Sequence, residues 1–287
     1  MKRLAIAVIL LLCLVGAACA DEAAPKIRVG NLSFFNMNND EYEDFLVENW
    51  SGNLWNVYAI YAPEYAKFAT TDSSAVQFDS LADMIMALKA DKIDSMEMPE
   101  PVAKYFFSLK ENREKFIPVN VVRGVEYFMS MGFLEGSKWY QPFNEALKAM
   151  TDDETLLMLK AHYIFEPSEK SLSPVKFEHF PDAETVKIAV TGDMPPMDFI
   201  AADGTPAGFN TALLAEIAKR LKVNVEIVNI DSGARVSALT SGRADGVFWF
   251  WYDTVTPKQR QAPKEIMLTE PYCSWDTFMY VGNKVKK

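Results

Sequence analysis

The sequence predicts an α/β fold with two lobes. The chain has 287 residues, more than a single hydrophobic core usually contains, which favours two units of ordinary domain size. Residues 185–252 read as strand, proline-rich loop, turn, helix, strand, helix and strand. A similar plan recurs earlier in the chain, so we expect two α/β lobes that face each other.

Residues 1–20 have the pattern of a secretory signal peptide. A basic start precedes the apolar run 4–15, and small residues follow it. We expect cleavage after Ala20 and a periplasmic or extracellular protein. Acylation of Cys19 is the less favoured alternative, because Gly16 stands where a lipoprotein signal normally has a branched apolar residue.

Composition limits the kinds of partner. The net charge is −10 and becomes −12 when the signal, with Lys2 and Arg3, is removed. Nucleic acid and anionic membrane surfaces bind basic patches, so neither is an expected partner. Of the cysteines only Cys273 would remain after cleavage, which leaves no intramolecular disulfide to stabilise the fold.

The first unit, residues 26–165, shows strand and helix patterns along most of its length. Apolar residues recur at helical spacing in 81–90, and Ser80 is placed to cap this helix with Asp83 in its first turn. Further strands are expected at 27–35, 75–78, 92–98, 116–122 and 125–133, and further helices at 102–109, 139–150 and 154–164.

Residues 166–183 carry three prolines and three serines with little apolar periodicity, which predicts a linker. The second unit, 184–283, then repeats the first in outline. Lys-Ile-Arg-Val opens one and Lys-Ile-Ala-Val the other, and each has a helix, a tight turn and an Asp before an apolar strand. These aspartates are Asp94 and Asp245.

The second unit resembles the bacterial extracellular solute-binding proteins of family 3, which are type II periplasmic binding proteins. The resemblance rests on the loop DMPPMDF (193–199), the turn GTPAGFN (204–210), the segment ALTSGRAD (238–245) and the segment LTEPY (268–272). The first unit resembles the other lobe of that family. The resemblance implies a two-lobed type II periplasmic-binding-protein fold with a ligand cleft between the lobes.

The two halves stand in the reverse of the order usual in that family. A circular permutation that joins the original termini through 166–183 accounts for this order, and a tandem duplication without its outer halves is the rival account. Permutation is tolerated where the termini lie close together at the surface. Both accounts lead to the same two-lobed fold.

The second unit supplies most of the candidate ligand-binding residues. Prolines stiffen the loop after the first strand of this unit, which would hold Asp193, Met194 and Met197 at the cleft. Trp249 and Trp251 lie in the aromatic run FWFWY, where alternation would turn one set of rings toward the opening. Aromatic rings there favour an apolar or cationic ligand held by stacking or cation–π contact.

The turn that follows the proline loop also makes local predictions. Gly208 permits a tight turn, Asn210 is placed to cap a helix at 211–221, and Phe209 is expected in the core.

Charged candidates follow from the resemblance. Amino-acid-binding members clamp the ligand carboxylate with an arginine, and Arg260 and Arg235 are the two candidates for that task. On the other lobe, Glu100 corresponds to a segment whose acidic residue pairs with a ligand ammonium, and Glu97 is the near alternative. Ser33 follows the first strand, where that lobe offers donors to an anionic group.

The resemblance implies a receptor that captures a small polar or amino-acid-like solute and delivers it to the membrane permease of an ABC importer. We expect a monomer with no enzyme activity, catalytic residues, cofactor or metal; His162 and His179 are the only histidines. Two alternatives stay open. One is a dehydratase-like enzyme on the same fold, with Glu100 or Asp193 as acid–base residue, and the other is a soluble sensory or interaction module.

Overall fold

The computed structural model describes residues 27–32, 73–166, 169–201, 203–253 and 262–284. Its largest element is a mixed sheet of nine strands, in the order β2, β1, β3, β12, β4, β10, β5 and β9, with β11 paired to β4. These strands are β1 (Ile27–Leu32), β2 (Ser73–Phe78), β3 (Ser95–Pro99), β4 (Phe116–Leu134), β5 (Thr185–Val190), β9 (Asn224–Asn229), β10 (Gly246–Tyr252), β11 (Ile266–Leu268) and β12 (Cys273–Asn283).

A small second sheet and the helices complete the fold. The small sheet consists of β6 (Asp193–Met194), β7 (Asp198–Ile200) and β8 (Pro206–Ala207). The helices are α4 (Leu81–Lys89), α5 (Glu100–Ser108), α6 (Lys110–Lys115), α7 (Tyr140–Asp152), α8 (Thr155–Lys160), α9 (Phe209–Leu221) and α10 (Arg235–Thr240), with a π-helical turn η3 (Ala161–Phe165) and 3₁₀ turns η4 (Glu169–Leu172) and η5 (Ser232–Ala234). Within the described residues, no helix is long and apolar enough to cross a membrane.

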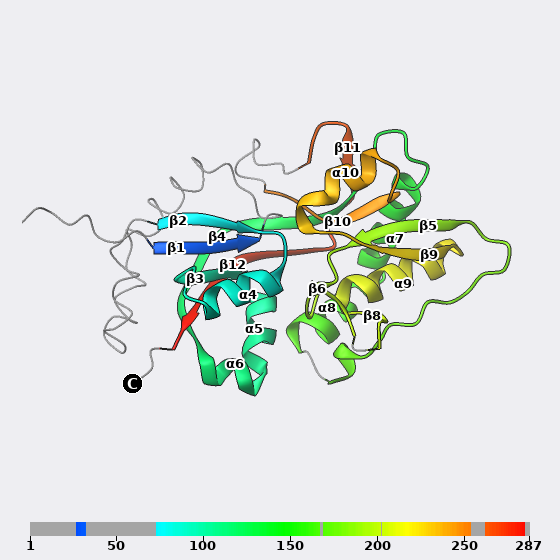
Figure 1. Cartoon of the computed structure of the whole chain (residues 1–287). Coiled ribbons are helices and arrows are strands. Elements are labelled where there is room, and N and C mark those ends of the chain that lie inside the picture. The colour runs from blue at the N-terminus through cyan, green and yellow to red at the C-terminus, as the bar shows by residue number, and fades with distance from the viewer. Residues whose placement is uncertain (1–26, 33–72, 167–168, 202, 254–261, 285–287) are drawn as a thin grey trace, which may run out of the picture.

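The sheet consists of two halves that exchange strands. In one half β2, β1 and β3 are parallel, and β12 pairs with β3 in antiparallel fashion. In the other half β9, β5 and β10 are parallel, and β4 pairs antiparallel to β10. Each half therefore receives its antiparallel strand from the other part of the chain, and Figure 1 shows β4 and β12 running between them. The predicted two-lobed α/β fold is confirmed.

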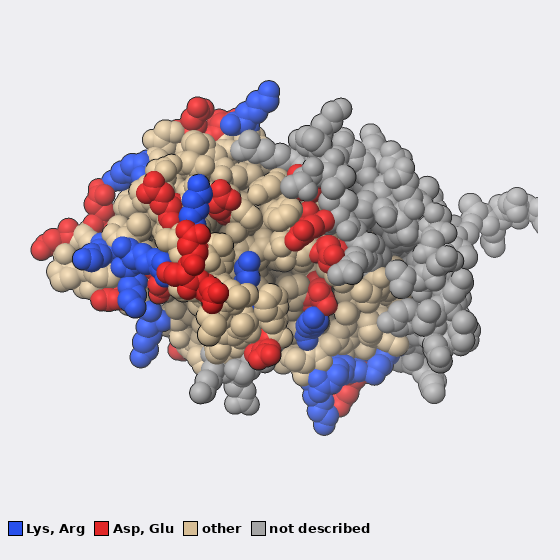
Figure 2. Space-filling model, turned by 180° about the vertical axis from the view of Figure 1, so that it is seen from behind, with Lys and Arg blue, Asp and Glu red and all other residues tan. Residues whose placement is uncertain are grey.

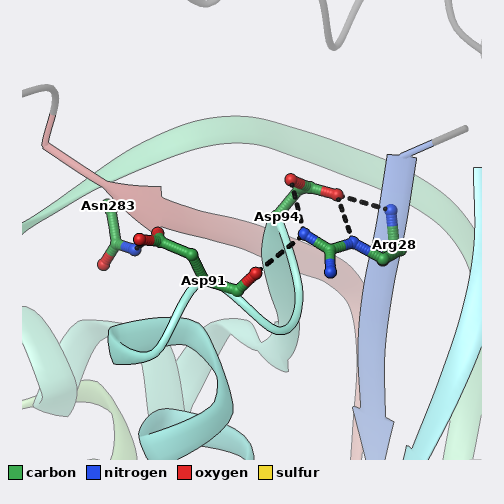
Figure 3. A network of polar contacts seen from close by, with 4 residues as sticks. All are labelled: Arg28, Asp91, Asp94 and Asn283. Carbon is green, nitrogen blue, oxygen red and sulfur yellow. Dashed lines mark hydrogen bonds and ion pairs between the residues drawn. The ribbon is translucent and has the colours of Figure 1, made fainter. Parts of the chain in front are cut away.

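The halves also share a local hydrogen-bond pattern. Arg28 N donates to Asp94 Oδ2 at 2.9 Å, and Asp94 N donates to Arg28 O at 2.8 Å. Lys187 N and Asp245 Oδ2 make the same contact at 2.8 Å, with Asp245 N donating to Lys187 O. Asp94 thus connects the residues before β3 to β1, and Asp245 connects the residues before β10 to β5. Figure 3 shows the first of these contacts, with Asp91 nearby.

Several predicted elements are confirmed and two are wrong. Ser80 Oγ caps α4 by accepting from Asp83 N at 3.0 Å, as expected. The strands predicted at 116–122 and 125–133 are one continuous strand, β4, because it pairs with β12 and then with β10 and β11. Asn210 does not cap α9: the N-cap is Gly208, and the Asn210 side chain bonds a buried carboxylate instead.

Most of the core lies on one face of the sheet. A single cluster of buried side chains joins residues of α4 and α5 to residues of α7 and α9, packed on the sheet strands, and Figure 1 shows α4 and α5 below β1 and β2. A smaller cluster lies between α10 and strands β5, β10 and β11. The core is therefore continuous across both halves on one face.

The residues predicted as a linker contact the second half where the structure describes them. Asn224 donates to Phe180 O at 2.9 Å and accepts from Phe180 N at 3.0 Å, and Val175 N donates to Pro206 O at 3.0 Å. The boundaries of the two units remain predictions. On the rear face drawn in Figure 2, acidic and basic side chains of the described residues lie interspersed.

We predict that Asp245→Ala lowers the free energy of unfolding by about 1 kcal/mol, because Lys187 N loses a charged acceptor at an exposed position. Asp152→Ala is the matched control, since Asp152 is an exposed aspartate at the end of α7. Urea unfolding of both variants measures the difference. Equal stability of the two variants would contradict a structural role for the Asp245 contact.

Candidate functional site

A fully buried carboxylate organises the loop after β5. Asp198 Oδ1 accepts from Gly192 N at 2.7 Å and from Thr191 Oγ1 at 2.9 Å. Its Oδ2 accepts from Asn210 Nδ2 and from Trp249 Nε1, both at 2.6 Å. One carboxylate therefore holds the proline-rich loop, the start of α9 and strand β10 in a fixed arrangement.

The same loop reaches across to the other half of the molecule. Asp193 Oδ2 accepts from Leu81 N at 2.8 Å, at the first residue of α4. A helix N-terminus favours a negative charge because its first N–H groups have no partner within the helix. Beside this contact, Ser232 Oγ donates to Asp79 O at 3.0 Å. We call these two contacts, Asp193 to Leu81 and Ser232 to Asp79, the junction.

Both aspartates have altered acidity. Burial raises the pKa of Asp193 to about 6, the negative charge of Asp198 adds to the rise, and the hydrogen bond from Leu81 N opposes it. Burial also raises the pKa of Asp198, against the hydrogen bonds that it accepts from Gly192, Thr191, Asn210 and Trp249. Asp193 therefore titrates closer to neutral pH than an ordinary aspartate does.

The two methionines of the loop are part of the core. Met194 and Met197 have 0% exposure and pack in the large apolar cluster, as does Phe209, whose predicted place in the core is confirmed. Gly208 shapes this region: its φ is +98°, and a Cβ atom there would lie 2.6 Å from Met197 O. The loop is therefore packed tightly against the start of α9.

The aromatic run does not alternate as a regular strand. The register of β10 against β4 shifts between Val247 and Phe250, and Trp249 has a φ of +71°. Both Trp249 and Trp251 are buried, at 0% and 2% exposure. The bulge explains why the expected separation of the rings into a core set and an open set is wrong for this run.

Arg235 is buried and bonded within the second half. Its Nε donates to Ser232 O at 2.8 Å, its Nη1 donates to Trp249 O, and its guanidinium lies 5.4 Å from the centre of the Phe250 ring. Burial lowers the pKa of Arg235 to about 9. The arginine thereby links the residues beside the junction to the bulge of β10.

The remaining predicted residues lie elsewhere. Glu100 is at the first position of α5 and forms an ion pair with Lys104 at 2.8 Å. Ser33 and Arg260 lie outside the described residues. Arg235 therefore bonds Trp249 directly, and Asp193 lies near Asp198, the partner of the Trp249 indole. Glu100 instead pairs within α5.

Sequence reasoning missed the central residue. Asp198 stands between Met197 and Phe199 in the printed sequence, and a carboxylate enclosed by apolar neighbours is a signal of burial. Tyr272, whose hydroxyl accepts from Trp249 N at 3.2 Å, was likewise read only as part of a motif.

Residues 186–287 match the family model of bacterial extracellular solute-binding proteins, family 3. This segment is similar to that family. It contains Asp193 and Ser232, so the second half's side of the junction lies inside the family match. No curated protein matches the sequence.

Solved structures of binding proteins are similar at low identity. The zinc-bound ligand-binding component of an ABC-type import system from Staphylococcus aureus has 10% identity and a TM-score of 0.42, with 89% of this chain and 65% of that chain covered. The periplasmic aliphatic sulphonate binding protein SsuA from Escherichia coli has 11% identity and a TM-score of 0.37, with 90% and 65% covered. The chain thus spans 65% of the length of each of these two proteins.

The ligand-binding core of GluR0 in complex with L-glutamate has 13% identity and a TM-score of 0.39, with 92% of this chain and 87% of that chain covered. The similarity to the solute-binding family covers residues 186–287.

We predict that Gly208→Ala lowers the free energy of unfolding by about 3 kcal/mol or more, because the new Cβ would clash with backbone oxygens. Gly204→Ala is the matched control: its φ is +83°, and a Cβ atom there would meet nothing within 4 Å. Its expected cost is about 1 kcal/mol, from the backbone conformation alone. Thermal unfolding tests this, and equal losses would contradict the proposed close packing.

We predict that Asp193 weakens the folded state as the pH rises. A carboxyl whose folded pKa is raised, here from 3.8 to about 6, stabilises the fold below its unfolded pKa, and this stability is lost as the pH passes the folded pKa. Relative to Asp193→Asn, the wild-type protein should lose up to about 3 kcal/mol between about pH 4 and pH 7. Urea unfolding at several pH values measures the difference.

The control for this experiment is Asp203→Asn. Asp203 is exposed, and the hydrogen bonds from Thr205 lower its pKa, so its substitution should produce no loss of this sign in that pH range. A wild-type stability that keeps a constant offset from Asp193→Asn at every pH would show that Asp193 is not held in a buried setting.

Proposed function

We propose that the protein is a solute-binding receptor that captures a small solute between its two halves and delivers it to the membrane permease of an ABC importer. The family match of residues 186–287 supports a solute-binding role. Secretion, predicted from residues 1–20, agrees with such a role. The protein acts as a monomeric carrier in this proposal and catalyses no reaction.

The observation that carries the proposal is the hydrogen bond from Leu81 N to Asp193. It joins the loop after β5, in one half, to the first residue of α4, in the other half. The halves are also connected through the long strands β4 and β12, where a bend would separate them, and through the shared apolar core. Closure of two lobes about such connections around a solute is the hinge motion of periplasmic binding proteins.

The junction fits a closure contact because it is small and polar. The carboxylate of Asp193 and the hydroxyl of Ser232 would bond water when the halves separate, so each loses little when the contact opens. A solute that contacts both halves then supplies the free energy that favours the closed form. Ligand binding and the junction are therefore expected to strengthen each other.

A second candidate function is an acid–base enzyme on the same fold, such as a dehydratase. The observation that favours it is the pair of aspartates, because the raised pKa of Asp193, about 6, suits proton transfer near neutral pH. Turnover of a prephenate-type substrate by the wild-type chain, lost in Asp193→Asn, would replace the receptor with this alternative.

We predict saturable thermal stabilisation of the chain without residues 1–20 by one class among amino acids, polyamines, peptides and organic acids. A solute at a hundred times its dissociation constant stabilises by about 2.7 kcal/mol. Asp193→Ala should lower the affinity for that solute by a few-fold, because it removes the closure contact. Asp203→Ala should leave the affinity unchanged. Failure of every solute class to stabilise the wild-type chain would overturn the receptor proposal.

A further inference from the structure

Four basic side chains lie at one edge of the first half. They are Lys89 in the last turn of α4, Arg113 and Lys115 in the last turn of α6, and Lys284 directly after β12. All four residues are exposed. Figure 2 shows basic side chains gathered at the lower edge of the molecule, where Figure 1 places α6. We call these four residues the basic edge.

Contacts between distant parts of the chain bring the four residues together. Lys284 N donates to Lys115 O at 2.9 Å, and Lys284 Nζ donates to Arg113 O. The Lys89 ammonium lies 5.9 Å from the centre of the ring of Phe116, the residue after Lys115. The basic edge is therefore a product of the fold, because no single run of the sequence contains all four residues.

The charges of the basic edge are not neutralised by ion pairs. None of the four residues pairs with a carboxylate in the part of the chain that the structure describes. Arg113 Nη1 donates to Phe107 O at 2.6 Å, near the end of α5, and Lys284 bonds carbonyls at the end of α6. Basic residues commonly satisfy helix ends in this way. A carbonyl accepts the hydrogen bond without cancelling the charge, so the positive charges remain.

Nearby carboxylates offset only part of this charge. Glu114 of α6 pairs with Lys110, at 3.8 Å. Asp91 accepts from Asn283 Nδ2 at 3.0 Å, and Glu111 lies in the first turn of α6, at the other end of the helix from the basic edge. The basic edge therefore carries an excess of positive charge.

Lysines without exposed aromatic residues beside them favour a diffuse negative surface over a protein partner. The cores of protein interfaces are depleted of lysine and enriched in aromatic residues. The basic edge has three lysines, and the large apolar side chain exposed on α4 is Met86, one turn before Lys89. Lysines that flank an exposed apolar side chain are typical of segments that contact anionic lipid headgroups. Anionic phospholipid is therefore the favoured partner.

The acidity of the whole chain does not prevent such a contact. The net charge is −10, but at physiological salt the interactions of exposed charges are screened beyond about 8 Å. Charges outside the basic edge therefore act weakly on a surface that touches it. In the sequence, Lys286 and Lys287 follow Lys284 closely, so the chain next to the basic edge carries two further positive charges.

We propose that the basic edge binds the surface of a membrane that contains anionic phospholipids. The ammonium groups of Lys89, Lys115 and Lys284 would lie against lipid phosphates, with Met86 in the headgroup layer. The contact would hold the first half of the protein at the membrane. It does not depend on the proposed receptor function, because no solute takes part in it.

The test measures sedimentation of the chain without residues 1–20 together with lipid vesicles. Vesicles of equal parts phosphatidylglycerol and phosphatidylcholine should bind the chain, vesicles of phosphatidylcholine alone should not, and added salt should weaken the binding. Each lysine at an anionic surface contributes about fivefold to binding, so Lys115→Gln combined with Lys284→Gln should lower the affinity about twentyfold. The matched control combines Lys148→Gln with Lys187→Gln, which removes the same charge from exposed lysines outside the basic edge. Its affinity should stay within about twofold of wild type.

Several results would overturn the membrane contact. These are absence of binding to the mixed vesicles, equal binding to phosphatidylcholine alone, and equal losses in the two double variants, which would assign the effect to net charge. Binding to polyglutamate without binding to the mixed vesicles would assign the basic edge to an acidic protein instead. None of these results bears on solute binding, so the receptor proposal would stand.

A single substitution covers the case in which the variant with both Lys115→Gln and Lys284→Gln is less stable than wild type in thermal unfolding. Lys89→Gln leaves the contacts between α6 and the end of β12 intact. It should lower the affinity for the mixed vesicles about fivefold. Unchanged affinity of Lys89→Gln would then overturn the proposal.

Discussion

The Asp198 carboxylate is the constraint on which the arrangement of the second half around the loop after β5 depends. A buried carboxylate is costly unless its oxygens accept several hydrogen bonds, and Asp198 accepts four, from Thr191, Gly192, Asn210 and Trp249. These donors belong to the loop after β5, to α9 and to β10. The hydrogen bonds to the Asp198 carboxylate therefore fix the relative positions of these three elements. The position of Asp193 at the junction follows from that arrangement.

This constraint also explains the irregular strand. Trp249 must direct its indole N–H to Asp198 while its carbonyl accepts from Arg235 and its N–H reaches Tyr272. A regular strand would not direct all three groups to these partners, and β10 instead has a bulge with a φ of +71° at Trp249. The strained backbone of Trp249 is thus held in place by its three polar contacts.

Local patterns predicted much of the fold and less of the site. Helical spacing and the Ser80 cap gave α4, and the repeated Lys-Ile start with Asp94 and Asp245 indicated two units of one plan. The strand exchange through β4 and β12 depends on pairing between residues far apart in the chain, which no local pattern contains. The role of Asn210 was misread for the same reason, because a short polar residue near a helix start suits a cap unless a buried carboxylate competes for its amide.

Opposed electrostatic effects leave the junction finely balanced. The N-terminus of α4 favours the charge of Asp193, whereas burial and the neighbouring Asp198 disfavour it. Since separation of the halves would return Asp193 to water, its charge opposes closure near neutral pH while its hydrogen bond supports it. In the proposed receptor, a closed form held by such nearly cancelling terms is shifted by the modest differential affinity of a small solute.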